Sequence, residues 1–502
     1  MAQADIANAA TSLDVFILTF NAGKQHIDPS VFGLHLRDAF GKDGLPDLVV
    51  ICLQEMSPLA HSFIGSYMIN PYFQKYTSAV NIAASSSISS LTQGGEEHIE
   101  YSDGYQGQGE RPLQDEPEGS PYTLVTTRHV GMTGIMLFAL DSTALHDLRS
   151  TEVSFGAGEM ANKGAVGLRM FYTKEDAQGL ERKTELTFVA THLAPHEWNL
   201  EKRNKNWESV VSGLLFEDPK KLHGPKSVCP TPSPSTSDDE GGALLSQHQG
   251  PIEKALHDIT IYKPGSHLFV AGDLNYRISK TRPNSESKLP DLDPKSANYF
   301  KEFLTLDQLT LERTAGRTLH GLHESTISFP PTYKLEIVDK KEPPRDVPTH
   351  QNSSRAARDV VRWKWVSNRW PGWCDRVLYL DVPPWASPLP PTKKMEIHTI
   401  AYDALPPVRT SDHRAVYLRL KVPVLEPSVL APPHDLPAVL SNDPRVKLPY
   451  PVDFDAWESR ARFKKWEPII GWSMLVSQSS QGIAIFTILF LVGMGAWWLK
   501  SL

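Results

Sequence analysis

The sequence predicts an α/β fold in which two β-sheets pack face to face and helices lie outside them. Many short runs rich in Val, Ile, Leu, Phe and Thr have the length and composition of β-strands. Helical patterns separate only some of these runs, whereas a doubly wound parallel sheet needs a helix after almost every strand. Many strands with few crossover helices therefore favour two packed sheets.

The expected strands are apolar runs, and most of them end in a polar residue. They cover residues 14–21, 47–55, 129–140, 164–172, 185–193, 267–275, 376–382 and 415–422. The clearest helical patterns lie at residues 199–218 and 296–316. Three segments rich in small, polar or Pro residues, at about 81–121, 219–252 and 338–358, are expected to be solvated insertions.

Composition and charge indicate a folded protein that lacks the net positive charge of proteins that coat nucleic acid. The 502 residues are 40% hydrophobic and 22% charged, as in globular proteins. A formal net charge of −7 disfavours nucleic acid as a partner. Cys52, Cys229 and Cys374 are too few and too scattered for a disulfide framework or a zinc site, which indicates a reducing compartment. The oligomeric state is left open.

The C-terminal region predicts a membrane anchor. Residues 482–499, "GIAIFTILFLVGMGAWWL", hold no charge, and as a helix they would span roughly 27 Å of hydrocarbon. Trp497 and Trp498 are typical of a membrane interface. Because little chain follows, we expect a tail anchor with the bulk of the protein in the cytosol, and the modest length favours the endoplasmic reticulum. A buried core helix is the weaker alternative, since the run is apolar all round.

Polar residues of a consistent kind close the expected strands. They are Asn21, Gln54 with Glu55, His192, Asp273 with Asn275, and Asp412 with His413. A single such residue would be read as a turn former or a solvated group. Five such strand ends in one chain are harder to explain in that way. Carboxylate, amide and imidazole groups without paired thiolates suit Mg²⁺ better than zinc.

Mg²⁺ in such a site commonly acts on phosphate esters. Hydrolysis also needs a group that orients or deprotonates water, and donors for the developing negative charge. Asp273 is the candidate for the first task, with Asn275 beside it to hold water or phosphate. The two side chains face the same way if the strand continues that far. Asp412 would keep a His413 imidazolium charged if a turn brings the two together.

Other phosphate chemistries find no support in the sequence. A cysteine phosphatase requires Arg six residues after its Cys, and none of the three cysteines has one. "DLD" at 291–293 lies between two prolines with no strong strand before it, which disfavours an aspartyl-phosphate enzyme. The chain has neither a Walker A loop nor HExxH. Metal-assisted attack of water is left as the preferred chemistry.

Together the motifs resemble the inositol polyphosphate 5-phosphatases, within the Mg²⁺-dependent endonuclease/exonuclease/phosphatase enzymes. The resemblance rests on "TFNAG", "LQE", "NKGAVGLR", "THLAPH" with "RN", "GDLNYRI", "PPTYK", "PGWCDRVLY" and "SDHRAV", over about residues 14–420. "GDLNYR" and "WCDR" are the most specific of these, whereas "SDH" and "QE" are shared with nucleases. With its C-terminal segment, the chain is similar to the fungal tail-anchored phosphatidylinositol 4,5-bisphosphate 5-phosphatases.

The resemblance implies a fold and a domain layout. The fold would be α/β (α+β), a four-layer sandwich of two packed, mainly antiparallel β-sheets flanked by helices, plus a C-terminal transmembrane helix. Residues 1–425 would form the catalytic domain, 426–481 a Pro-rich linker and 482–499 the anchor. The enzyme would hydrolyse the 5-phosphate of the membrane lipid phosphatidylinositol 4,5-bisphosphate, giving phosphatidylinositol 4-phosphate by in-line attack of water.

The resemblance also implies roles for matching residues. Glu55, with Asn21 nearby, would hold Mg²⁺. Asp273 would orient or deprotonate the attacking water, with Asn275 beside it. His192 and His413 would contact the scissile phosphate, and Asp412 would support His413. The substrate would be bound by Tyr333, Lys334 and Arg376 at the 4-phosphate, by Lys163 toward the 1-phosphate, and by Arg277 in support or in phosphate contact.

Some outer positions have other interpretations or depart from the family. Lys163 could equally be a solvated turn residue. Leu335, Arg369 and Ala415 stand where the family commonly has an aromatic residue, a lysine and a proline. None of these positions belongs to the expected metal and water residues.

Two alternative functions are open from the sequence. One is a nuclease of the same superfamily, which "PPTYK", "WCDR", the acidic balance and the anchor disfavour. The other is a catalytically idle, membrane-tethered phosphoinositide binder. An idle protein would be expected to have lost Glu55, Asp273 or His413, and all three are present.

Overall fold

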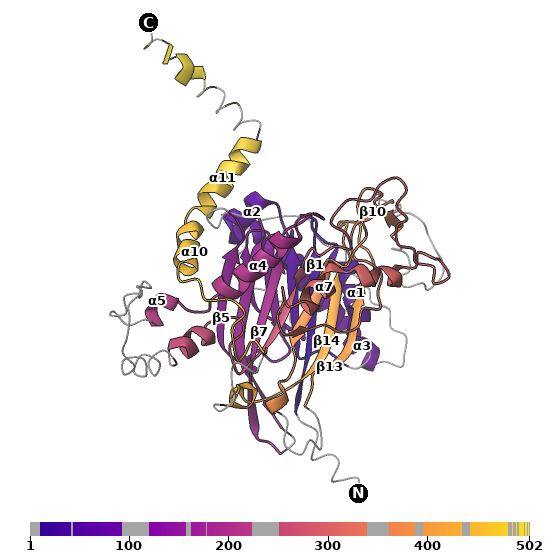
Figure 1. Ribbon diagram of the computed structural model, residues 1–502, viewed down its shortest axis with the longest axis vertical. Coiled ribbons are helices and arrows are strands. Elements are labelled where there is room, and N and C mark those ends of the chain that lie inside the picture. Colours follow the sequence, from indigo (N-terminus) through magenta and orange to yellow (C-terminus); the bar gives the residue numbers. More distant parts are fainter. Residues whose placement is uncertain are drawn as a thin grey trace, which may run out of the picture.

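The computed structural model describes most of residues 11–479. The described ranges are 11–92 without 42–43, 120–222 without 157–161 and 177, 250, 252–338, 361–386, 395–433 and 442–479, with single positions and short stretches beyond. Within these ranges two six-stranded sheets face each other, and helices cover their outer faces (Figure 1). The four-layer arrangement predicted from the strand pattern is therefore confirmed.

The first sheet has the order β13-β14-β1-β2-β4-β3. Its strands are β13 (His398–Ala404), β14 (Val416–Pro423), β1 (Ser12–Asn21), β2 (Leu48–Gln54), β4 (Thr133–Ala139) and β3 (Thr123–Val130). Within this sheet only β1 and β2 run parallel, and the other neighbours are antiparallel. The sheet is therefore mixed, with one parallel pair at its centre.

The second sheet repeats this pattern, in the order β5-β6-β7-β8-β12-β9. Its strands are β5 (Leu145–Ser154), β6 (Gly164–Glu175), β7 (Glu181–His192), β8 (Ser266–Asp273), β12 (Asp375–Leu380) and β9 (Leu322–His323). Here β7 and β8 form the parallel pair, and the remaining neighbours are antiparallel. A separate small ribbon joins β10 (Leu335–Ile337) and β11 (Trp363–Trp365).

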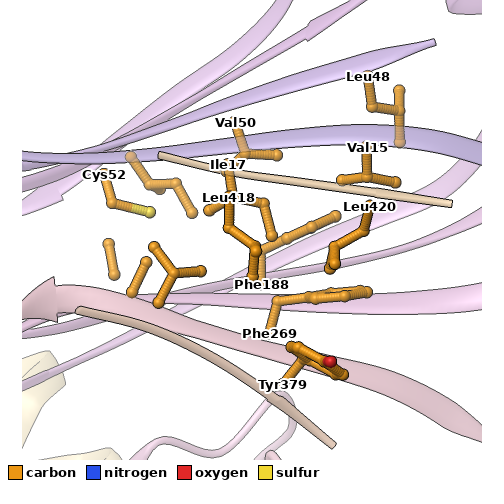
Figure 2. Packing of buried hydrophobic residues seen from close by; sticks show 14 of the residues in the cluster. Val15, Ile17, Leu48, Val50, Cys52, Phe188, Phe269, Tyr379, Leu418 and Leu420 are labelled. Atoms are coloured by element: carbon orange, nitrogen blue, oxygen red, sulfur yellow. The ribbon is translucent and has the colours of Figure 1, made fainter. Parts of the chain in front are cut away.

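Apolar side chains fill the space between the two sheets. Figure 2 shows Ile17 and Val50 of the first sheet facing Phe188 and Phe269 of the second. Successive strand residues point to opposite faces, so Phe16 joins the core on the outer side of the same strand. Both faces of the central strands are buried, which explains why their sequences are continuously apolar.

Helices complete the outer layers. Helices α1 (Pro29–Phe40) and α3 (Ser66–Thr92) cover the first sheet, and α4 (Leu200–Gly213) covers the second. Shorter helical elements are α2 (Leu59–Ile64), α5 (Pro219–Leu222), α7 (Gln308–Thr314) and the 3₁₀ turns η2 (Ser142–Ala144), η4 (Phe300–Leu306) and η5 (Pro384–Ala386).

Three expected elements differ in the structure. The run 129–140 contains the end of β3, a two-residue turn at Gly131 and the whole of β4. The pattern at 296–316 is divided into η4 and α7 because Asp307 is extended and caps α7 through Thr310. The insertion expected at 81–121 begins as helix, since α3 continues to Thr92. Residues 93–119, 223–249 and 339–358 lie outside the described residues.

The segment 426–481, expected to be a linker, contains helices that pack on the two-sheet body. They are α9 (Pro427–Leu430), α10 (Ala456–Lys464) and α11 (Glu467–Gln478). The Asp453 amide donates to the carbonyl of Ser212 at 2.9 Å, next to the C-terminus of α4. Buried Arg460 pairs with Glu152 of β5 at 3.0 Å. A Pro-rich linker was expected, whereas long-range contacts hold the described helices α10 and α11 against the sheets.

Among the residues that the structure describes, no helix is both long enough and apolar enough to cross a membrane. About half of the positions of the expected anchor, 482–499, lie outside the described residues.

Candidate active site

The parallel pair at the centre of each sheet places polar residues at one edge of the molecule. In the first sheet Asn21 pairs with Gln54 at the ends of β1 and β2. In the second sheet His192 pairs with Asp273 at the ends of β7 and β8. Antiparallel β12 begins at the same edge, with Asp375 opposite Asp273. Because parallel strands end at the same edge of a sheet, residues far apart in sequence meet here.

A glycine lets the last two residues of β8 lie close to β7. A Cβ atom added to Gly272 would lie 1.9 Å from the carbonyl oxygen of Thr191. No side chain fits at that distance, so only glycine permits this spacing of the two backbones. The close approach fixes Asp273 beside His192.

Two of the predicted site residues have left-handed backbone conformations. Glu55 follows β2 with φ of 43°, and Asn275 follows β8 with φ of 57°. Such angles are uncommon outside glycine and cluster at functional sites. Because β8 ends at Asp273, the expectation that Asp273 and Asn275 share one face of a continuing strand is wrong. Instead the backbone N–H of Asn275 donates to Oδ1 of Asp273 at 3.1 Å.

The Asp273 carboxylate is the centre of the site. It is 1% exposed, and its Oδ2 accepts a hydrogen bond from Nδ2 of Asn21 at 3.0 Å. Nε2 of His192 lies 3.2 Å and Nε2 of His413 lies 4.0 Å from the same oxygen. Burial raises the pKa of Asp273, but the hydrogen bond from His192 and the nearby positive charges outweigh burial and hold that pKa well below its usual range. The carboxylate is therefore ionised.

His413 is held by a carboxylate that the sequence did not single out. Its Nδ1 lies 2.9 Å from Oδ2 of Asp375, which also accepts a hydrogen bond from the Thr332 hydroxyl at 2.7 Å. Burial lowers the pKa of His413, but the charge of Asp375, followed by that of Asp273, raises it to about 9. His413 is therefore an imidazolium at neutral pH, with Nε2 directed toward Asp273.

Asp412, the expected support of His413, is not its hydrogen-bond partner, but its charge raises the pKa of His413 after those of Asp375 and Asp273. Oδ2 of Asp412 forms an ion pair with the ammonium group of Lys334. The signal for Asp375 was available in "PGWCDRVLY", where a carboxylate begins a buried strand.

Lys163 lies at the centre of the site, against His192. Its Nζ is 3.2 Å from Nδ1 of His192 and also contacts Nε2. Burial lowers the pKa of Lys163 to about 8, although Asp273 and Glu55 act in the opposite direction. Burial and the charge of Lys163 also lower the pKa of His192, so this imidazole is neutral. Nε2 of this neutral ring lies against both the Asp273 carboxylate and the Lys163 ammonium group.

The motifs "PPTYK" and "GDLNYR" meet beside His413. The ring of Tyr333 lies 4.7 Å from that of His413, and the guanidinium of Arg277 lies 4.2 Å above the same tyrosine. Lys334 is about one third exposed and forms a cationic rim next to the buried groups. Arg277 donates to the carbonyl and side-chain oxygens of Asn275, so it holds that loop in place.

The side-chain amide of Asn275 is likewise occupied by the protein. Its Nδ2 donates to the carbonyl of Leu193 at 3.1 Å, and its Oδ1 accepts from Arg277. Asn275 therefore joins the ends of β7 and β8. Its expected contact with water or phosphate is not supported by this arrangement.

Arg376 does not reach the site, so the expected contact with the 4-phosphate is wrong. Its side chain is 0% exposed and forms a paired interaction with both oxygens of Glu324, at 2.6 and 2.7 Å. Its remaining nitrogen donates to Asp307 at 3.1 Å and to the carbonyl of Trp373. Since β12 alternates its side chains, Asp375 faces the site and Arg376 faces the opposite way.

The donor chemistry of the site fits a hard divalent cation. Burial raises the pKa of Glu55, but the positive charges of Lys163 and Lys24 act against burial and the pKa lies below its usual value, so this carboxylate is ionised. Its side chain is 27% exposed. Asn21 is less free, because its Oδ1 accepts from Gly23 and its Nδ2 donates to Asp273. Glu55 and Asn21, which were expected to hold Mg²⁺, thus both lie at the site, and Glu55 is the more available ligand.

A second group of side chains could also hold a metal ion. Asp273, Asp375 and His413 place ligand atoms within 4.8 Å of one another. Oδ1 of Asp375 is buried and has no hydrogen-bond partner within the described part of the chain. Binding through His413 would require its neutral form, which Asp375 disfavours, because an imidazolium has no free lone pair.

Comparison with known proteins identifies relatives that match about half of this chain or more. Phosphatidylinositol 3,4,5-trisphosphate 5-phosphatase 1 of Xenopus laevis is 24% identical over 306 residues, which cover 60% of this chain and 23% of that protein. Polyphosphatidylinositol phosphatase INP53 of Saccharomyces cerevisiae is 26% identical over 260 residues, which cover 52% of this chain and 16% of that protein. The matched segments span less than a quarter of either relative.

The solved structures include the inositol polyphosphate 5-phosphatase domain of SPsynaptojanin, in complex with inositol (1,4)-bisphosphate and calcium ion. It aligns with a TM-score of 0.48 and 18% identity, over 84% of this chain and 88% of that one. The family model described as Endonuclease/Exonuclease/phosphatase family 2 matches residues 18–419, which contain the whole second sheet, most of the first sheet and every residue of the site. The chain therefore belongs to the Endonuclease/Exonuclease/phosphatase family 2.

Proposed function

We propose that this protein is a Mg²⁺-dependent phosphoinositide 5-phosphatase that converts phosphatidylinositol 4,5-bisphosphate into phosphatidylinositol 4-phosphate. The observation that carries the proposal is the convergence of Asn21, His192 and His413 on the buried carboxylate of Asp273. The curated relatives, among them the inositol-1,4,5-trisphosphate 5-phosphatase 1 of Schizosaccharomyces pombe, support the choice of the 5-phosphate.

The residues suggest how water and phosphate are handled. Asp273 is ionised and rigidly held, so it acts as an acceptor that orients the attacking water. The His413 imidazolium can donate from Nε2 to an oxygen of the scissile phosphate, where negative charge develops. Asp375 keeps His413 charged throughout. A Mg²⁺ ion bound at Glu55 would neutralise phosphate charge and stabilise the leaving oxygen.

The rim of the site suits a second phosphate. Lys334 and Tyr333 adjoin His413, and the ammonium group of Lys334 can exchange its partner Asp412 for a phosphate. Lys163 contributes a further positive charge at the centre. A ring with neighbouring phosphates would place one against His413 and the next against Lys334, which favours a 4,5-bisphosphate.

The lipid and the membrane belong to the same proposal. We infer that residues 482–499 anchor the chain in a membrane, with the catalytic domain in the cytosol and the endoplasmic reticulum as the preferred location. The uncharged length of the segment and its terminal tryptophans support this inference. Tethering raises the local concentration of a membrane substrate for the enzyme.

The test is phosphate release from a panel of short-chain phosphoinositides, with and without Mg²⁺. We expect phosphate release from the 4,5-bisphosphate only when Mg²⁺ is present. The Asp273→Ala variant should release no phosphate, although its circular dichroism spectrum shows an intact fold. Plain duplex DNA is the control for nuclease activity, and we expect no cleavage. Full activity of Asp273→Ala would contradict the mechanism, and release of a different phosphate would contradict the assigned specificity.

A further inference from the structure

Helix α11 carries a stripe of apolar side chains that no described part of the chain covers. Ile469, Trp472 and Val476 are 56%, 51% and 42% exposed. At about 100° per residue they fall within roughly 60° of arc on one side of the helix. Trp466, 58% exposed, precedes the helix near the same side. We call Ile469, Trp472 and Val476 the α11 stripe.

The opposite side of α11 is fixed to the catalytic domain. A Cβ atom added to Gly471 would lie 2.9 Å from the carbonyl of Ala60 and 2.9 Å from Ile64, so the two helix backbones touch. Arg460 of the preceding α10 is buried and joins Glu467 at the start of α11 at 2.6 Å. The α11 stripe is therefore presented in one orientation relative to the catalytic domain.

The stripe lies at the active-site end of the molecule. Helix α2, against which α11 packs, begins at Leu59, four residues after Glu55. Figure 1 shows α2 and α11 at the same end of the molecule. A surface that binds the α11 stripe would therefore lie next to the sheet edge at which the candidate catalytic residues lie.

Three observations favour a lipid bilayer as the occupant. Exposed tryptophans beside aliphatic residues are typical of helices that lie in a membrane interface. Arg462 and Lys465 are exposed just before α11 and would attract anionic lipid. The sequence after α11 becomes the uncharged run 482–499, whose described member Trp497 is 72% exposed. A stripe continuous with such a run favours lipid over a second protein chain.

We propose that α11 docks in the interface of the bilayer, with Ile469, Trp472 and Val476 inserted among the lipids, and holds the active-site edge at the membrane surface. The inference rests on the proposed function, since the substrate is then a lipid in the same bilayer. The docked helix, rather than tethering alone, sets the orientation of the catalytic domain.

The first test compares vesicle-borne and soluble substrate. The full chain is reconstituted in phosphatidylcholine vesicles containing phosphatidylserine and phosphatidylinositol 4,5-bisphosphate. For Ile469→Ser/Trp472→Ser/Val476→Ser we expect a rate on the vesicle substrate about tenfold lower. The rate on a soluble dioctanoyl substrate should be unchanged. Equal vesicle rates for variant and parent, or equal losses on both substrates, would overturn the proposal.

A matched control removes apolar groups from the opposite end. Leu180 and Val429 are 55% and 39% exposed and lie near the start of β7, away from the site. Leu180→Ser/Val429→Ser should leave both rates unchanged. A fall in its vesicle rate equal to that of the stripe variant would overturn the assignment to α11.

A second measurement does not depend on catalysis. An environment-sensitive dye is placed on Val476→Cys or on Leu180→Cys, each in the full chain with Cys229→Ser. We expect a blue shift on reconstitution only at position 476. An unshifted dye there, or a shift that grows with the protein-to-lipid ratio as contact between copies would, overturns the proposal. If the parent hydrolyses no soluble phosphoinositide, the proposed function fails while the dye still decides the docking.

Discussion

Nδ1 of His413 lies 2.9 Å from Oδ2 of Asp375, across 38 positions of sequence, and this contact makes the imidazole a cation. The adjacent Asp412, nearer in sequence, instead pairs with Lys334. The two carboxylates therefore have separate tasks. Asp375 holds His413 by a hydrogen bond and contributes most to its charge, and Asp412 pairs with a lysine at the rim.

The first prediction separates these two carboxylates. Asp375→Asn removes the charge that stabilises the imidazolium, and we expect kcat to fall by about 10²-fold or more. Asp412→Asn should lower kcat by less than about tenfold, because Lys334 keeps its charge. Both are measured as phosphate release from a soluble 4,5-bisphosphate, with thermal melting as a control for folding. A larger loss in Asp412→Asn would return the support of His413 to Asp412.

The second prediction contrasts Arg376 of "WCDR" with Lys334 of "PPTYK", the two basic residues that were expected to bind the 4-phosphate. Arg376→Met leaves buried Asp307 without its ion-pair partner and buried Glu324 with only Arg313 at 3.7 Å, and we expect the free energy of unfolding to fall by about 3–5 kcal/mol. Lys334→Met should leave stability nearly unchanged but raise KM about tenfold for substrates with a 4-phosphate. Urea unfolding measures the free energy of unfolding, and steady-state kinetics measure KM. An unchanged KM in Lys334→Met, or a stable Arg376→Met with raised KM, would contradict the assignment.

The third prediction concerns the metal. Chelation with EDTA should abolish phosphate release, and added Mg²⁺ should restore it without refolding. If Glu55 is the ligand, Glu55→Gln raises the Mg²⁺ concentration for half-maximal activity by roughly tenfold or more. Asp375→Asn should then leave that concentration unchanged while lowering kcat. The reverse result would locate the ion at Asp273, Asp375 and His413.

The fourth prediction tests the close contact of β7 and β8. Gly272→Ala forces a methyl group against the Thr191 carbonyl, and we expect a loss of about 3 kcal/mol in the free energy of unfolding. Activity should fall as well, because Asp273 is displaced from His192. Gly372→Ala is the matched control, since the nearest atoms to its added Cβ lie at 4.0 Å. Equal stability of the two variants would show that the contact is easily relaxed.

The fifth prediction is a pH dependence of stability. Burial, followed by the charge of Arg445, lowers the pKa of His267 from 6.5 to about 4. The unfolded chain therefore binds a proton between these values that the folded chain excludes, so stability is complete above pH 6.5 and declines as the pH falls toward 4. One pKa unit corresponds to about 1.4 kcal/mol, so the loss approaches about 3 kcal/mol.

The control for this effect is His267→Gln, which can keep a donor toward the carbonyl of Pro423 but does not titrate. Chemical denaturation of both proteins between pH 4 and pH 7 measures the difference. The variant should lose less stability over this range than the parent. Parallel curves would show that other groups cause the acid sensitivity.

The sequence by itself determined the strands and the residues that close them. Apolar runs such as 14–21 and 47–55 are local patterns, and the parallel pairing of their strands brings Asn21 and Glu55 to one edge. The same holds for His192 and Asp273. These predictions succeeded because hydrophobic burial selects the strands, and the ends of parallel strands must meet.

Only the tertiary structure decided which side chains work together. The choice of Asp375 over Asp412, the burial of Arg376 and the turn at Asn275 each depend on which way one residue faces at the end of a strand. A shift of one position reverses that direction, and composition does not record it. The packing of α10 and α11 likewise depends on partners such as Glu152, more than 300 positions away in the sequence. Contacts over such distances are fixed by the folded core, because local propensity contributes too little free energy to select them.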